Sequence, residues 1–310
     1  MKAYTNNNKQ DIQLLAILLF ILVFIAGCAS TKYIEDYQAI VKKVEIDSID
    51  KAYKEAAYLY VQKDIKPTEG LGINVAIYNV FNTKDGKYRK TNIKPLGSPP
   101  PILDSTLVEI SRAQIEKFLK SKGFFNAKVK SEIAVKNKKA KLKFTAKTGE
   151  PFMVNKLTHE IEDQNIKTLY FGEKERFTQL REGMQYDEDS LSYEREEIYK
   201  LMRQKGYYDF VRPYVRFEPD SNQNNNKVSV KLIVDNPIDS NITTHRIYKI
   251  GETNIIVAPS TEGFTDSITL NKRTFNGIRF TDLSGKFRRN PITRYDFIKR
   301  GENYNIDNET

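Results

Sequence analysis

The sequence predicts an α+β protein made of tandem units with the element order β-α-α-β-β, and a third unit that begins but stays incomplete. Three observations predict this fold class. A helix-ending motif at Arg112 recurs at Arg195, 83 residues later, and such a repeat marks one structural unit used twice. Alternating apolar and polar residues follow each copy, which is the period of half-buried strands. A further strand and a shorter helix are predicted before each copy.

The repeated motif has the pattern of the end of a long helix. Its apolar residues recur at helical spacing, a lysine lies near the negative end of the helix dipole, and a glycine follows. We therefore expect Gly123 and Gly206 to be structural helix caps at positive φ. The two copies read Arg112-x-x-Ile115-x-x-Phe118-Leu119-x-x-Lys122-Gly123-Phe124-Phe125 and Arg195-x-x-Ile198-x-x-Leu201-Met202-x-x-Lys205-Gly206-Tyr207-Tyr208.

The same helices begin at equivalent residues. Asp104 and Asp187 are the expected N-caps, and Thr106-x-x-Glu109 adds a capping box in the first copy. The aromatic pair after each glycine is expected to pin the helix to its sheet, the alternative being carbohydrate binding.

The remaining elements follow from the hydrophobic pattern. In the first hairpin, Val129, Ile133 and Val135 are expected on the buried face, with lysines on the other face. The predicted ranges are 39–46 and 152–161 for opening strands, 49–61 and 173–180 for short helices, and 127–136, 140–146, 211–217 and 228–234 for hairpin strands.

The first thirty residues differ in composition from the rest. A weakly basic start precedes residues 14–27, an uncharged run too short for a hydrocarbon layer of about 30 Å, which is typical of a cleaved signal peptide. The run ends in Ile25-Ala26-Gly27-Cys28, which resembles the bacterial lipobox, and Ala29 favours sorting to the outer membrane. Cys28 is the one cysteine of the chain, so we expect it to carry an anchoring lipid. The alternative is an uncleaved signal anchor with a buried cysteine.

The net charge and the lack of catalytic or metal-binding motifs exclude several classes of function. Without Lys2, Lys9 and Asp11 of the leader, the 50 basic and 40 acidic residues still leave a positive excess, which favours nucleic acid or an anionic membrane as partner. Export excludes nucleic acid, and lysines spread along strands and helices indicate a solvated basic surface. His159 and His245 have no partner at metal-ligand spacing, and neither a nucleophile elbow nor a phosphate loop is present. The sequence therefore predicts no enzyme, metal or cofactor, and an envelope hydrolase is the least favoured class.

With its elements in this order, the chain resembles the POTRA domains of outer-membrane protein assembly factors of the BamA/TamA type. Gly149-Glu150-Pro151-Phe152 is similar to the step that opens a POTRA strand, and Gly183-x-x-Tyr186-Asp187 to the turn before the long helix. Leu96-Gly97-Ser98-Pro99-Pro100 is similar to the end of an insertion in TamL, the lipoprotein version of Bacteroidota. A third copy starts at Tyr248-x-Ile250-Gly251, and Gly301-Glu302-Asn303-Tyr304-Asn305 aligns with residues 183–187.

The resemblance implies three-stranded sheets with two helices on one face. A BamA/TamA-type protein would continue into a β-barrel, whereas no barrel strands are predicted in this sequence. The implied organisation is a signal peptide (1–27), a lipid-anchored linker (28–37), a POTRA-like domain with an insertion (38–148), a second (149–238) and an incomplete third (239–310). The first hairpin strand of each sheet is expected at an edge. The edge residues are Lys128, Val129 and Lys130 in the first domain and Arg212, Tyr214 and Arg216 in the second, which Pro213 interrupts.

The implied function is assembly or insertion of outer-membrane β-barrel proteins from the periplasmic side, by adding client strands to a sheet edge without catalysis. The expected partners are outer-membrane protein clients, an inner-membrane or periplasmic assembly partner, and the membrane through the lipid. Two alternatives stay open. In the first, the edge strands bind no client, and their lysines only prevent unwanted pairing with other strands. In the second, the protein is a periplasmic scaffold lipoprotein that binds envelope proteins without a barrel of its own.

Overall fold

The computed structural model describes residues 34–67, 70–81, 97–222, 225–237, 243–257, 277–293 and 299–309, with Thr31, Thr274 and Phe275. The predicted signal peptide and Cys28 lie outside these residues. The chain forms two compact units, residues 1–151 (the first unit) and residues 152–310 (the second unit).

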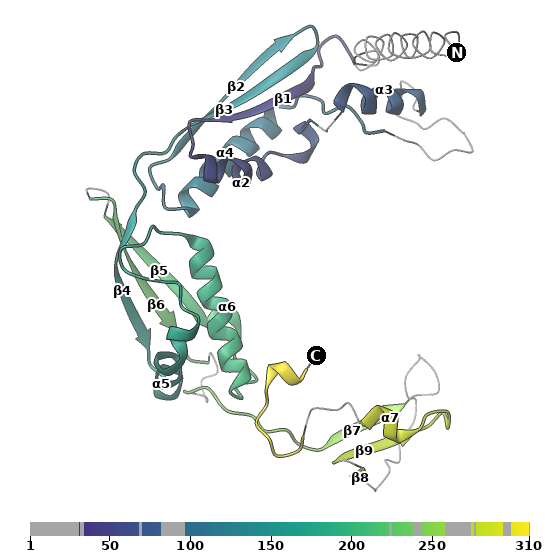
Figure 1. Ribbon diagram of the computed structural model, residues 1–310, viewed down its shortest axis with the longest axis vertical. Coiled ribbons are helices and arrows are strands. Elements are labelled where there is room, and N and C mark those ends of the chain that lie inside the picture. Colours follow the sequence, from purple (N-terminus) through teal and green to yellow (C-terminus); the bar gives the residue numbers. More distant parts are fainter. Residues whose placement is uncertain are drawn as a thin grey trace, which may run out of the picture. The chain divides into compact units, whose positions relative to one another are not determined.

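The first unit contains a three-stranded sheet of order β1-β3-β2, with α2 and α4 on one face (Figure 1). Strand β1 is parallel to β3, and β2 pairs with β3 in antiparallel fashion through a turn at Asn137 and Lys138, both at positive φ. Ile115 and Leu119 of α4 pack against Leu142 and Phe144 in the core. The elements are β1 (Ile40–Asp47), α2 (Lys51–Leu59), α3 (Leu71–Phe81), α4 (Ser105–Ser121), β2 (Lys128–Lys136) and β3 (Lys139–Lys147).

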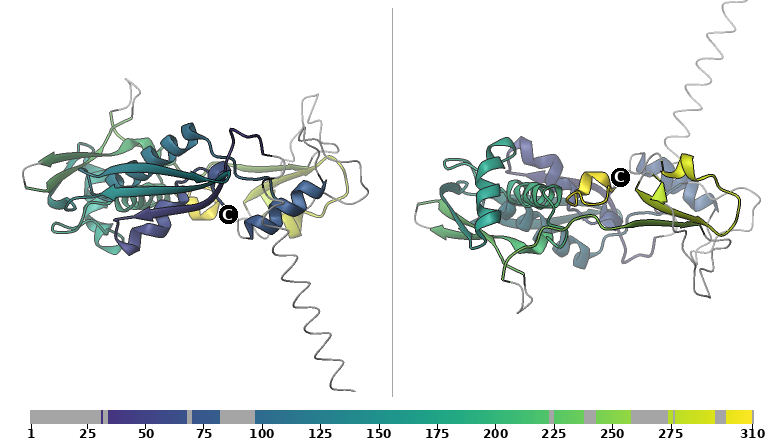
Figure 2. Two further views of the ribbon diagram at one scale, coloured as in Figure 1. Left: turned by 90° about the horizontal axis from the view of Figure 1, so that it is seen from above. Right: turned by 90° about the horizontal axis from the view of Figure 1, so that it is seen from below.

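The second unit contains a sheet of the same topology, of order β4-β6-β5, with α5 and α6 on one face (Figures 1 and 2). Its core joins Ile166 and Tyr170 of α5, Ile198 and Met202 of α6, and Leu232 of β6. The elements are β4 (Met153–Ile161), α5 (Gln164–Glu173), α6 (Glu188–Gln204), β5 (Val215–Asn222) and β6 (Lys227–Val234). The order β-α-α-β-β and the three-stranded sheets confirm the predicted fold class.

The opening of a third copy forms within the second unit. In every copy the start of the first strand makes an antiparallel bridge to the segment before the next helical turn, at Ile40–Ile102, Met153–Gln185 and Lys249–Asn303. This confirms the alignment of residues 301–305 with residues 183–187. A third sheet of order β7-β9-β8 contains β7 (Thr253–Val257), β8 (Thr274–Phe275) and β9 (Ile278–Asp282), and α7 (Arg289–Thr293) follows it.

The predicted helix ends are confirmed. Gly123 and Gly206 have φ values of +85° and +104°, a region that only glycine adopts at low cost. Asp104 and Asp187 accept hydrogen bonds from the N–H groups of the first helical turn. The capping box is wrong, because Asp104 is the N-cap and Glu109 instead forms an ion pair with Arg112.

The two residues of an aromatic pair can have different contacts. Phe124 and Tyr207, the first member of each pair, are buried in the cores as predicted. Tyr208 instead lies edge-on to Tyr248 and Tyr304, residues of the third copy. The C-terminal 3-10 turn (Ile306–Asn308) lies beside the end of α6 (Figure 2), so the end of this helix supports the third copy.

Three predicted elements are wrong in place or extent. The short helix of the second unit is α5, capped by Asp163, and it ends at Glu173, so the rest of the predicted range 173–180 is a 3-10 turn and a loop. Strand β5 begins at Val215 because residues 212–214 form a 3-10 turn. Ile133 and Val135 are 42% and 55% exposed, since the helices cover only the first part of β2. Helix α3 in the insertion was not predicted.

Candidate strand-binding edge

Strands β2 and β5 lie at sheet edges, as expected from the resemblance. Lys128, Val129 and Lys130 lie on β2, and Arg216 lies on β5. Arg212 and Tyr214 do not lie on the edge strand, because both belong to the 3-10 turn before it. Arg212 forms an ion pair with Glu196 and stacks on the Tyr199 ring, 3.8 Å from its centroid.

Helix α4 covers the first outward position of the β2 edge. The N–H of Val129 donates to Glu116 Oε2 at 3.1 Å, and its C=O accepts from Arg112 Nη1 at 3.2 Å. The two helix side chains therefore take the place that a neighbouring strand would have at Val129. Val129 is therefore not available to an incoming strand, because its outward N–H and C=O groups are already bonded.

The carboxylate of Glu116 is held in place by cations. Lys120 Nζ lies 2.8 Å from Glu116 Oε1, and Arg112 lies 3.2 Å from Oε2. The hydrogen bond from Lys120 is the main cause that lowers the pKa of Glu116 to about 2. Glu116 therefore stays ionised and keeps its bond to the N–H of Val129 across the physiological pH range.

Beyond Val129 the edge is open. Outward and inward residues alternate along an antiparallel strand, so Ser131, Ile133 and Val135 share the orientation of Val129, while Lys130 bonds inward to β3. No residue that the structure describes hydrogen-bonds these three outward N–H groups. Ile133 and Val135 also expose apolar side chains there. The sequence indicated the edge strand but not these three residues, because which backbone groups face outward depends on the register.

The edge of the second unit is shorter. Arg195, which occupies the place of Arg112, donates through Nε to the C=O of Val215 at 2.9 Å. The outward positions are therefore Val215, Phe217, Pro219 and Ser221, and Pro219 has no N–H to offer. Pro213 was expected to interrupt this edge, but it lies in the turn before the strand, and Pro219 interrupts it instead. The first unit offers the longer row of outward groups.

The opposite edges are covered where the opening strands begin. The N–H of Val41 donates to Pro101, and the N–H of Val154 donates to Met184. In the second unit, Glu182 also accepts from the N–H of Leu157 at 3.1 Å. The start of each opening strand is therefore closed to a further strand.

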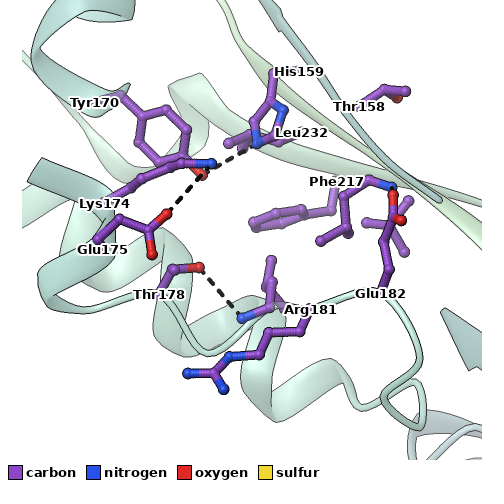
Figure 3. Close-up of a pocket in the computed structure, with 13 residues that line it drawn as sticks. Thr158, His159, Tyr170, Lys174, Glu175, Thr178, Arg181, Glu182, Phe217 and Leu232 are labelled. Carbon is purple, nitrogen blue, oxygen red and sulfur yellow. Dashed lines mark hydrogen bonds and ion pairs between the residues drawn. The ribbon is translucent and has the colours of Figure 1, made fainter. Parts of the chain in front are cut away.

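The second unit also contains a pocket of about 430 Å³ between the helix-covered face of its sheet and the α5 segment (Figure 3). Leu157, Phe217 and Leu232 supply apolar lining from the strands, and Lys174 and Thr178 line the opposite wall. Figure 3 shows His159 and Tyr170 pointing toward each other at its upper end.

A polar chain beside this pocket joins three elements of the core. Tyr170 Oη donates to Glu194 Oε1 at 3.2 Å and lies 3.4 Å from His159 Nε2. Burial raises the pKa of Tyr170 and of Glu194, and it lowers the pKa of His159. All three groups are thus driven toward their neutral forms, which suits a packed hydrogen-bond chain.

The second histidine, His245, is buried. The backbone N–H of His245 donates to Asp163 at 2.8 Å, and its ring packs between Phe210 and Tyr214. Within the described part of the chain, no three His, Cys, Asp or Glu side chains gather as a metal site would require. None of the helices described there has the length and apolarity of a membrane span.

The geometry defines a class of protein: tandem β-α-α-β-β units, each with the first strand of its hairpin at a sheet edge. No protein-family model matches the sequence, and no curated protein is significantly similar to it. Solved structures similar to the chain include POTRA regions. BamA POTRA domains 3–5 of Haemophilus influenzae are 10% identical with a TM-score of 0.37, over 74% of both chains. Omp85 POTRA domains 1–3 of Anabaena are 12% identical with a TM-score of 0.33, over 88% of this chain and 82% of that one.

CdiB of Escherichia coli is 7% identical with a TM-score of 0.24, and the match covers 74% of this chain and 36% of that one. At such identities and scores, these similarities carry no functional argument. The assignment of fold class depends instead on the element order and strand pairing of each unit.

Proposed function

We propose that this chain is a periplasmic module of tandem POTRA domains that takes part in the assembly of outer-membrane β-barrel proteins. In this proposal Cys28 carries the lipid that anchors the chain to the outer membrane, as in TamL-type lipoproteins. The module has no catalytic step. It binds unfolded client strands by β-augmentation at the β2 edge of the first unit.

The observation that carries this proposal is the open edge beyond Val129. Ser131, Ile133 and Val135 present outward N–H and C=O groups, and the apolar side chains of the last two are exposed beside them. A strand from a β-barrel alternates apolar and polar residues, so its backbone can pair with this edge while its apolar side chains cover Ile133 and Val135.

The test is photo-crosslinking of the chain to ten-residue peptides taken from barrel strands. Ile133→Pro removes one outward N–H without breaking a bond to β3, and Ile133→Ala is the matched control that shortens the side chain but keeps the donor. One hydrogen bond contributes about 0.5–1.5 kcal/mol, so the proline variant should bind about 2- to 10-fold more weakly than the alanine variant.

Circular dichroism would establish that both variants keep their fold. Absence of crosslinking in the wild type would refute β-augmentation, as would equal crosslinking of the proline and alanine variants. Binding of folded envelope proteins that ignores the proline would favour the alternative, a scaffold lipoprotein.

A further inference from the structure

The open face of the first sheet concentrates positive charge. Residues paired across neighbouring strands share a face, and the pairs Lys128–Lys147 and Lys136–Lys139 place like charges directly opposite each other. This face lies away from α2 and α4 (Figure 1). Its charged residues are Lys43, Lys128, Lys130, Lys136, Lys139, Lys141, Lys143 and Lys147, against Glu45, Asp47 and Glu132.

The few carboxylates of this face neutralise only part of that charge. Glu45 accepts both Lys43 at 2.7 Å and Lys141 at 2.8 Å, and Asp47 lies 3.2 Å from Lys143. Lys128 lies 3.7 Å from Glu116 of α4. The other four lysines form no ion pair with any residue in the described ranges: Lys130, Lys136, Lys139 and Lys147.

The fold does not require this excess. The corresponding face of the second sheet has the same strand order, yet its charges nearly balance, with Lys156, Arg216, Lys227 and Lys231 against Glu160, Glu218 and Asp220. Lys231 lies 3.1 Å from Glu160 and 3.0 Å from Glu218, and Arg216 pairs with Asp235. Like charges directly opposite each other destabilise a sheet. The unpaired lysines of the first sheet therefore lower the stability of its unit, and no ion pair with a described residue offsets this loss.

We propose that this lysine face binds the anionic headgroups of a lipid membrane surface. A solvated sheet face three strands wide, with lysines distributed over every strand, can meet many phosphates at once. Each lysine near an anionic leaflet strengthens binding about five-fold, and several together give stable adsorption. Acidic segments of another protein are the competing ligand.

The position of the face in the chain favours the membrane. Strand β1 begins at Ile40, twelve residues after Cys28, so even a fully extended tether spans at most about 40 Å. In this respect the inference rests on the proposed function, which places the lipid on Cys28. Adsorption of the chain without its acyl chains is measured independently of that anchor, so the two proposals can fail separately.

The test is co-sedimentation of residues 29–310 with phosphatidylcholine vesicles that do or do not contain about one third phosphatidylglycerol, a composition that supplies the anionic surface. The triple variant Lys130→Gln, Lys136→Gln and Lys139→Gln should bind the anionic vesicles about 100-fold more weakly. Its matched control carries Lys156→Gln, Lys167→Gln and Lys227→Gln, three exposed lysines of the second unit without ion pairs to described residues. Because like charges are removed, the face variant should fold at least as stably as the wild type.

The expected result is binding to anionic vesicles alone, weakened by salt, lost in the face variant and retained in the control. Equal binding to both vesicle types would overturn the inference, as would equal losses in the two triple variants. So would capture of polyglutamate in place of vesicles, which would assign the face to an acidic protein partner.

Discussion

Gly206 caps the end of α6 and contacts the first residues of the third copy. An added methyl group at Gly206 should therefore disturb both the helix end and this contact. Its φ of +104° lies in the left-handed region, and a Cβ would approach Ile247 Cγ2 to 2.7 Å. Its C=O also accepts from the N–H of Tyr248 at 2.8 Å. Gly206→Ala should therefore strain the helix end and push Ile247 away from it.

Two other glycines of the same unit separate these effects. Gly183 has a φ of +87° but open space around a Cβ, and Gly172 in α5 has neither positive φ nor a close neighbour. The left-handed region costs an ordinary residue about 1–2 kcal/mol, whereas alanine in a helix is better than glycine by about 0.5–1 kcal/mol. We expect Gly172→Ala to stabilise, Gly183→Ala to destabilise by about 1 kcal/mol, and Gly206→Ala to destabilise by more.

Hydrogen exchange measured by mass spectrometry gives the opening free energy of each segment. Gly206→Ala should speed exchange in residues 243–250 and 301–309 as well as at the end of α6, whereas Gly183→Ala should spare the third copy. Combining Gly206→Ala with Ile247→Ala should recover the part of the lost opening free energy that is due to the clash between the two side chains. If Gly206→Ala costs no more than Gly183→Ala, or if Ile247→Ala recovers nothing, the contact does not matter and the reasoning fails.

Two further predictions concern a buried acid and the anchor. Burial raises the pKa of Glu194, so the folded state holds this proton more tightly than the unfolded state. The resulting loss of stability is absent below the ordinary pKa of 4.5 and grows as the pH rises through the raised pKa. Glu194→Gln should remove that fall from the opening free energy of α6, and an unchanged pH slope would contradict the assignment. Cys28→Ser should abolish acylation of the exported chain, measured by intact mass, and a wild-type chain without acyl mass would refute the proposed anchor.

Local chemistry made much of the fold predictable. The N-cap carboxylates of Asp104 and Asp187 and the left-handed glycines Gly123 and Gly206 act within a few residues, so the sequence displays them directly. The helix over 173–180 was misplaced because its apolar pattern also suits a loop packed on the core, whereas Asp163 supplies the real N-cap.

Properties of the candidate edge were less predictable because they depend on pairing. Period two correctly placed Val129 and Ile133 on one face of β2. Whether that face is buried depends on how far α2 and α4 extend over it, which no local pattern records. Similarly, the lysines are scattered along the sequence, and only the order β1-β3-β2 brings them onto one surface.

The two units show how one helix residue sets where an open edge begins. Arg112 and Arg195 occupy equivalent places, and each donates to the first outward carbonyl of its edge strand. Each thereby closes the edge next to the core and leaves the distal hairpin available. In the first unit the hairpin continues with Ser131, Ile133 and Val135, whereas in the second unit Pro219 removes a donor two positions beyond Phe217. Of these two edges, β2 therefore offers the longer continuous row of backbone groups to the strand binding proposed above, which is why the proline test belongs there.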